Sequence, residues 1–165
     1  MKEDNIRDII SFCAERQIVI MADEVYQANI YNNSKPFVSF RKVLKQMQEQ
    51  STKFKDVQLV SFHSTSKGMI GECGKRGGYF EAIGFPADVR AEFYKLASIS
   101  LCPNVIGQLT VGLMVNPPSK SDASYSQYTK EVADIYESLK RRAQKVTTAL
   151  RSLEGVTCNE SEGAM

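Results

Sequence analysis

The sequence has almost no histidine, no paired cysteines, little net charge and no long hydrophobic run. His63 is its single histidine and its four cysteines show no CxxC spacing, so neither a metal site nor a disulfide framework is indicated. The net charge of +2 gives no reason to expect nucleic acid or a membrane as a partner. The longest apolar stretches, 18–22 and 105–115, are far shorter than the roughly 20 residues of a membrane span.

The remaining composition is that of a globular α/β protein. Hydrophobic residues make up 42% and charged residues 24% of the 165 residues, which suffices for one domain with a core. Helical periodicity alternates with short apolar runs, which favours a mostly parallel sheet with flanking helices. The expected helices cover 3–16, the stretches after Pro36 and Pro86, a mostly buried 104–115, and roughly 30 residues within 121–152. The expected strands cover 18–22 (buried on both faces), 57–62, 79–85 and a start at 155–158.

Two of the expected strands end in chemically notable residues. The first is followed by Asp23 and Tyr26, and the second by Lys67 and then a glycine-rich loop that holds Arg76. In open α/β sheets, ligands bind beyond the carboxyl ends of the strands. If the two strands are parallel neighbours, these four side chains converge on one crevice.

This set of side chains meets the needs of pyridoxal phosphate. The amine of Lys67 can bond the cofactor's aldehyde, and the carboxylate of Asp23 can stabilise a protonated pyridine nitrogen. The phenol of Tyr26 can hydrogen-bond the O3′ of the ring. A phosphate dianion prefers hydroxyls, backbone N–H groups and a guanidinium, which are supplied by Ser64, Ser66, the glycine-rich loop and Arg76.

The same segments resemble a known family. Ala-Asp-Glu-Val-Tyr at 22–26 and Ser-x-Ser-Lys-Gly at 64–68, closed by Arg-Gly-Gly-Tyr at 76–79, look like the fold-type I (class I/II) pyridoxal-phosphate-dependent aminotransferases. The longer string at 61–79 and the Gly-Ala-Met at 163–165 are similar to alanine aminotransferases in particular.

The resemblance implies roles for individual residues. Lys67 is the catalytic lysine, which holds the cofactor as a Schiff base and later acts as the base for the 1,3-proton transfer. Asp23 pairs with the pyridinium and Tyr26 contacts O3′. The phosphate is held by Ser64, Ser66 and Arg76. No metal is implied.

The resemblance also implies the wider organisation. Residues 1–120 are expected to be part of the large pyridoxal-phosphate-binding domain, and 121–165 a long interdomain helix with the start of the small C-terminal domain. The expected reaction is transamination, with L-alanine and 2-oxoglutarate giving pyruvate and L-glutamate. A homodimer acting on small amino acids and 2-oxo acids in the cytoplasm or the mitochondrion is expected, without nucleic acid or membrane as partners.

Several parts of the family pattern match no segment here. They are an upstream phosphate loop, a ring-stacking aromatic and an asparagine, and a downstream arginine for the substrate carboxylate, so we expect an internal piece of a longer enzyme. Two alternatives stay open. One is a lyase or synthase on the same fold, and the other is a truncated, non-catalytic fragment that acts at most as a binding or dimerisation module.

Plainer interpretations suit the other notable residues. Glu24 is expected to be structural, His63 to be a satisfied or surface histidine, and Cys73 to be an inert thiol. The glycines from Gly68 to Gly74 superficially resemble a nucleotide phosphate loop. The spacing is one residue too long, and Arg76 stands where a magnesium-binding Ser or Thr is required.

Overall fold

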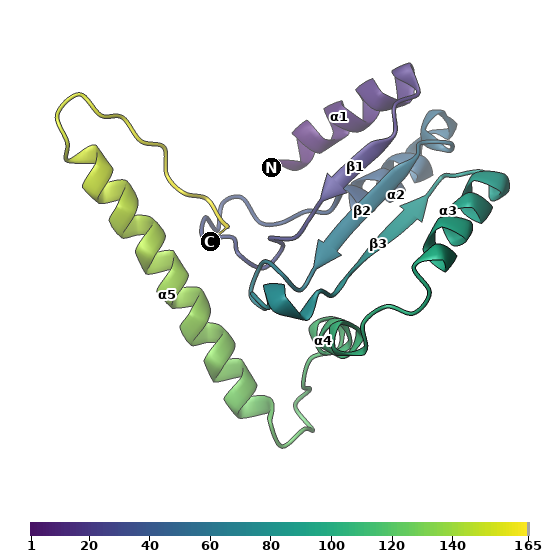
Figure 1. Ribbon diagram of the computed structural model, residues 1–165. Coiled ribbons are helices and arrows are strands. Elements are labelled where there is room, and N and C mark those ends of the chain that lie inside the picture. Colours follow the sequence, from purple (N-terminus) through teal and green to yellow (C-terminus); the bar gives the residue numbers. More distant parts are fainter. Residues whose placement is uncertain (165) are drawn as a thin grey trace.

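The computed structural model describes residues 1–164, which form one small sheet with helices beside it and a long helix standing apart from it (Figure 1). Within these residues, no helix combines the length and the apolar character that crossing a bilayer requires. The elements are α1 (Glu3–Arg16), β1 (Ile20–Asp23), α2 (Phe40–Gln50), η1 (Thr52–Phe54), β2 (Leu59–Ser64), η2 (Cys73–Lys75), β3 (Gly78–Ile83), α3 (Ala87–Ile99), α4 (Val105–Val115) and α5 (Tyr125–Arg151).

The sheet has the order β1-β2-β3 and is mixed. β1 and β2 are parallel, with Asp23 beside Phe62, as the sequence predicts for neighbouring strands. β2 and β3 are antiparallel, with Ser64 beside Gly78. The difference from an all-parallel sheet has a simple cause: α2 carries the chain back between β1 and β2, whereas the connection 65–77 contains no α-helix and returns directly.

The core lies on one face of the sheet, under α1 and α2. Ile20 and Ala22 of β1 point into it, while Met21 is 71% exposed on the other face. The expectation that this strand is buried on both faces is therefore wrong, since no described element covers Met21. The strand also begins two residues later than expected, at Ile20. The buried apolar cluster is Ile6, Ile10, Cys13, Ile20, Ala22, Val43, Leu44, Met47, Val57 and Leu59.

Two expectations for the second half are wrong. α4 forms at the expected place, but among its residues only Gly107 is buried. The segment 155–158 forms no strand, because no strand edge of the described chain lies beside it; the only nearby bridge joins Ile30 to Gly163. The exposed apolar residues of α4 are Val105, Ile106, Leu109, Leu113 and Val115.

The long amphipathic helix is confirmed as α5, with 27 residues. It stands beside the sheet rather than on it, and the chain after it returns to the loop that follows β1 (Figure 1). The Tyr136 hydroxyl donates a hydrogen bond to the Ile30 carbonyl at 2.7 Å, which ties the helix to that loop. The division of the chain at residues 120 and 121 stays a prediction.

Candidate active site

The two strand ends place Asp23 and Ser64 on the same face of the sheet. Asp23 ends β1 and is paired with Phe62 of β2, and Ser64 lies two residues further on. Paired residues of neighbouring strands and residues two apart in one strand share a face. Asp23, Phe62 and Ser64 therefore lie opposite the α1–α2 core. The Asp23 carboxylate is exposed there and accepts a hydrogen bond from the Val25 N–H at 3.4 Å.

A close backbone contact brings Lys67 to the loop that follows Asp23. Gly68 is buried and has a φ of +66°, and a Cβ on it would lie 2.9 Å from the Val25 carbonyl oxygen. Only glycine accepts this combination of left-handed backbone and close approach without strain. The turn after β2 is thereby seated on the loop after β1, which places Lys67 next to the segment that carries Asp23 and Tyr26.

The side chains of Lys67 and Tyr26 are not engaged elsewhere. Within the described residues 1–164, the Lys67 amine forms no ion pair or hydrogen bond and the Tyr26 hydroxyl has no hydrogen-bond partner. Lys67 is exposed, and Tyr26 is half-buried in a turn in which its carbonyl accepts from the Asn29 N–H at 3.1 Å. An amine and a phenol in this state are both open to a ligand.

The three residues expected to bind phosphate form one small cluster. The Ser64 hydroxyl accepts a hydrogen bond from the Ser66 N–H at 2.9 Å, and the Arg76 guanidinium lies 3.4 Å from the Ser66 hydroxyl. Arg76 also donates to the Cys73 carbonyl at 3.1 Å, which fixes the guanidinium over the loop. Two hydroxyls and one guanidinium at the carboxyl end of β2 suit a phosphate dianion.

Thr65 holds this cluster in place, and the sequence analysis did not single it out. It is fully buried, and both its N–H and its hydroxyl donate to the Gly77 carbonyl, at 3.0 and 3.1 Å. Its own carbonyl accepts from the Glu72 N–H at 2.8 Å. No pattern in the sequence points to it, because β2 ends at Ser64 and Thr65 lies in the turn that follows, where the alternation of a strand no longer holds.

Glu24 and His63, beside the site, have structural contacts. The Glu24 carboxylate accepts a hydrogen bond from the Phe40 N–H at 2.9 Å, and burial raises the pKa of Glu24 above its usual value. The His63 Nδ1 accepts from the Ser64 N–H at 3.0 Å. Burial lowers the pKa of His63, and the negative charge of Asp23 opposes that shift.

Solved structures show which class of protein has this fold. The alanine aminotransferase from Pyrococcus furiosus matches with a TM-score of 0.74 at 22% identity, covering 98% of this chain and 36% of that one. At this identity the match carries the fold, which is that of part of a fold-type I aminotransferase.

The family follows from the sequence comparison. The model of the aminotransferase class I and II family matches residues 1–165, and the chain belongs to this family of transferases. The cofactor that the family implies is pyridoxal phosphate. The cluster of Ser64, Ser66 and Arg76 fits its phosphate, and the unengaged amine of Lys67 fits its aldehyde.

Two curated relatives match almost the whole chain. A probable mitochondrial alanine aminotransferase of Dictyostelium discoideum is 59% identical over 98% of this chain and 30% of its own length. Glutamate–glyoxylate aminotransferase 1 of Arabidopsis thaliana is 52% identical over 100% of this chain and 34% of its own length. The chain thus spans about a third of the length of these relatives.

Proposed function

We propose that this protein transfers the amino group of L-alanine to 2-oxoglutarate, giving pyruvate and L-glutamate, with pyridoxal phosphate as cofactor. The observation that carries the proposal is the seating of Gly68 on the Val25 carbonyl, since it joins the two motifs into one site. The relative from Dictyostelium discoideum, named a probable alanine aminotransferase and 59% identical, supports the choice of substrate.

Each site residue has a task that its chemistry permits. When bound, pyridoxal phosphate supplies an aldehyde that an amine can bond and a ring that takes up electrons. The Asp23 carboxylate balances a proton on the ring nitrogen, and the Tyr26 hydroxyl hydrogen-bonds O3′. Lys67 provides the bonding amine. The phosphate is held by Ser64, Ser66 and Arg76.

Lys67 also carries the proton of the reaction. With cofactor and substrate bound, the Lys67 Nζ would be the group that accepts a proton from the substrate α-carbon. The exposed, unpaired state of the Lys67 side chain agrees with a group that must change partners. Gly68 and the loop behind it hold the backbone while the side chain moves.

Borohydride trapping tests the assignment of Lys67. Reduction of the full-length protein with its cofactor, followed by peptide mass spectrometry, is expected to find the phosphopyridoxyl mass on Lys67. Lys75, which lies in the same glycine-rich loop, is the internal control and should remain unlabelled. Label on Lys75 or on neither lysine would refute the assignment.

Amino-donor and acceptor pairs test the substrate. We expect alanine with 2-oxoglutarate to give the highest kcat/KM. The Arabidopsis relative named for glutamate and glyoxylate makes that pair the second to be measured. Elimination products from cysteine conjugates, or turnover of S-adenosylmethionine, with no transamination would favour a lyase or synthase of the same fold.

We further propose that the protein is a homodimer located in the mitochondrion or the cytoplasm. Light scattering checks the oligomeric state, and imaging of the tagged protein checks the location.

A second candidate concerns the 165-residue chain on its own, which we infer to be a non-catalytic fragment. The observation that favours it is the exposure of apolar side chains along α4, where Leu109 is 61% and Leu113 is 65% exposed. Uncovered apolar surface of this kind favours association over a defined site. Wild-type turnover by the purified 165-residue chain would contradict this second candidate.

A further inference from the structure

The segment Asn29–Tyr31 touches both the Lys67 turn and the helix α5. On one side, Asn29 is completely buried behind Gly68, and its Oδ1 lies 3.4 Å from where a Cβ on Gly68 would stand. The amide nitrogen and oxygen of the Asn29 side chain have no hydrogen-bond partner among the described residues. Because no hydrogen bond holds the Asn29 side-chain amide, its position depends on the groups that pack against it.

The other side of the segment is held by α5 and by the chain that follows it. The Ile30 carbonyl accepts the hydrogen bond from the Tyr136 hydroxyl at 2.7 Å, and the rings of Tyr31 and Tyr136 lie 5.8 Å apart. The Asn29 carbonyl accepts from the Ala164 N–H at 3.0 Å. A displacement of α5 at Tyr136 is thus passed to the residue next to Asn29.

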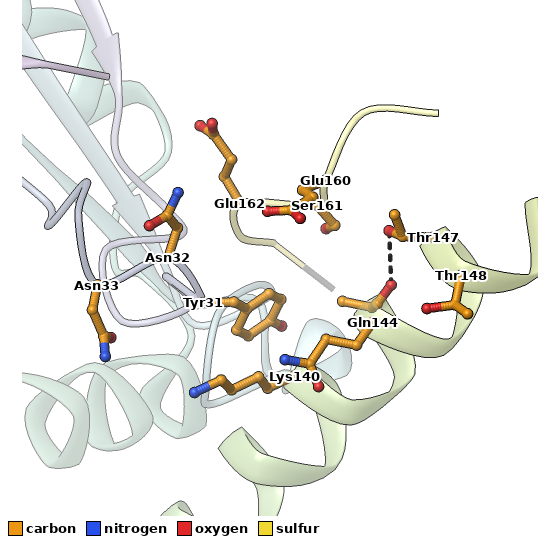
Figure 2. A pocket seen from close by; sticks show the side chains of 11 residues that line it. Tyr31, Asn32, Asn33, Lys140, Gln144, Thr147, Thr148, Glu160, Ser161 and Glu162 are labelled. Atoms are coloured by element: carbon orange, nitrogen blue, oxygen red, sulfur yellow. Dashed lines mark hydrogen bonds between the residues drawn. The ribbon is translucent and has the colours of Figure 1, made fainter. Parts of the chain in front are cut away.

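Tyr136 is the main polar link between α5 and the loop after β1. In the described part of the chain, it is the one residue of α5 whose side chain hydrogen-bonds to a residue preceding the helix. Beyond it, a cleft of about 280 Å³ separates the helix from the loop after β1 (Figure 2). Tyr31 and Lys140 lie toward this cleft from opposite sides, and the Thr147 hydroxyl turns back to the Ala143 carbonyl at 3.0 Å. The helix therefore has room to shift about the Tyr136 contact.

We propose that Tyr136 is a positioning residue for Lys67, acting through the segment Asn29–Tyr31 on Gly68. The inference rests on the proposed function for the role of Lys67, but the mechanical coupling does not need the cofactor. Holding α5 in place holds Ile30, which holds Asn29 against Gly68 and so fixes the backbone that carries the amine.

Hydrogen exchange of the full-length, cofactor-free protein tests the coupling directly. The Gly71 N–H donates to the Lys67 carbonyl at 3.3 Å and therefore reports on this turn. In Tyr136→Phe, which removes one neutral hydrogen bond, we expect the Gly71 amide to exchange about 2- to 10-fold faster. The Ile20 amide, bonded to the Gln58 carbonyl at 2.9 Å in the sheet, should be unchanged.

Tyr128→Phe is the matched control. Tyr128 lies on the same helix and is also half-buried, and its hydroxyl has no hydrogen-bond partner within residues 1–164. Equal Gly71 exchange in both variants and wild type would overturn the inference. Faster exchange at Ile20 as well as Gly71 would also overturn it, since the effect would then be general loosening.

A spectroscopic readout separates positioning from support of the fold. In the cofactor-loaded protein, Tyr136→Phe is expected to move the pH midpoint of the visible absorption band, while Tyr128→Phe leaves it in place. An unmoved midpoint would count against Tyr136. Faster Gly71 exchange without borohydride-trapped cofactor on wild-type Lys67 would refute the proposed function and leave the coupling intact. Trapped cofactor with unchanged exchange would refute the coupling alone.

Discussion

Replacing Gly68 with alanine tests the contact that makes one site of two motifs. The new methyl group would lie 2.9 Å from the Val25 carbonyl oxygen, and the backbone φ of +66° would be retained by a residue that disfavours it. Because the nearest atom belongs to the backbone, it cannot move aside as a flexible side chain would. We expect the Lys67 turn to shift away from the loop after β1.

The size of the effect can be worked out in two parts. A left-handed backbone costs an alanine about 1–2 kcal/mol relative to glycine, and an extra methyl forced into a packed place costs about 1–3 kcal/mol. Gly68→Ala should therefore lose about 2–5 kcal/mol. In a protein unit of about this size, 1 kcal/mol corresponds to roughly 2–4 °C in Tm.

Gly71→Ala is the control that separates the two parts. Gly71 has a nearly equal φ of +64°, yet a Cβ there would meet nothing within 4 Å. It should therefore lose only the backbone term, about 1–2 kcal/mol. Thermal unfolding of the two variants, with pyridoxal phosphate affinity measured by fluorescence titration, is the assay. Equal losses in stability and affinity in both variants would refute the contact as the feature that joins the motifs.

Three further predictions concern single side chains around the site. The pKa of the His63 imidazole, measured by NMR, should lie below 6.5, because burial disfavours its charged form. The unfolded chain then binds the proton more readily than the folded one, so the free energy of unfolding should fall as the pH drops through 6.5. His63→Asn should remove this pH dependence. Thr65→Val loses one of two hydrogen bonds to the Gly77 carbonyl, which should cost about 0.5–1.5 kcal/mol and lower the Tm; an unchanged Tm would show that the remaining bond from the backbone suffices. Arg76→Gln should weaken pyridoxal phosphate binding about 10- to 100-fold, since hydrogen bonds to charged groups contribute about 1.5–3 kcal/mol. The neighbouring Lys75→Gln should change the affinity little. Equal weakening in both variants would show that the positive charge of the loop, and not the Arg76 hydrogen bonds, holds the phosphate.

The parts of the fold that the sequence predicted are those set by local pattern. The apolar residues of α1 and α5 recur every three or four positions, a pattern that depends only on residues one helical turn apart. Both helices were therefore predicted near their observed bounds. The parallel pairing of β1 and β2 followed from the helix between them. The direction of β3 did not follow, because apolar strand patterns do not encode whether the connecting loop crosses over.

The errors concern burial, which depends on what lies beside an element. α4 is mostly apolar, with Gln108 and Thr110 as its polar residues, and such a sequence normally indicates a buried helix. In the described chain it is covered only near Gly107, which packs against the Arg76 carbonyl. The strand expected at 155–158 fails for the same kind of reason, since an apolar segment becomes a strand only where an edge is free to pair with it.

The candidate site divides in the same way. Side-chain chemistry identified Lys67 and Asp23 because their types and spacing resemble a family, and the structure leaves their individual roles as predictions. What the sequence could not supply is the means of assembly: a left-handed glycine on a carbonyl oxygen and a buried threonine, Thr65, closing the loop. These contacts are made to backbone carbonyl oxygens, which every residue has. The residue types in the sequence therefore do not predict which carbonyls are contacted. Motifs therefore predict the chemistry of the site, whereas its geometry depends on two residues, Gly68 and Thr65, to which the proposed reaction assigns no chemical role.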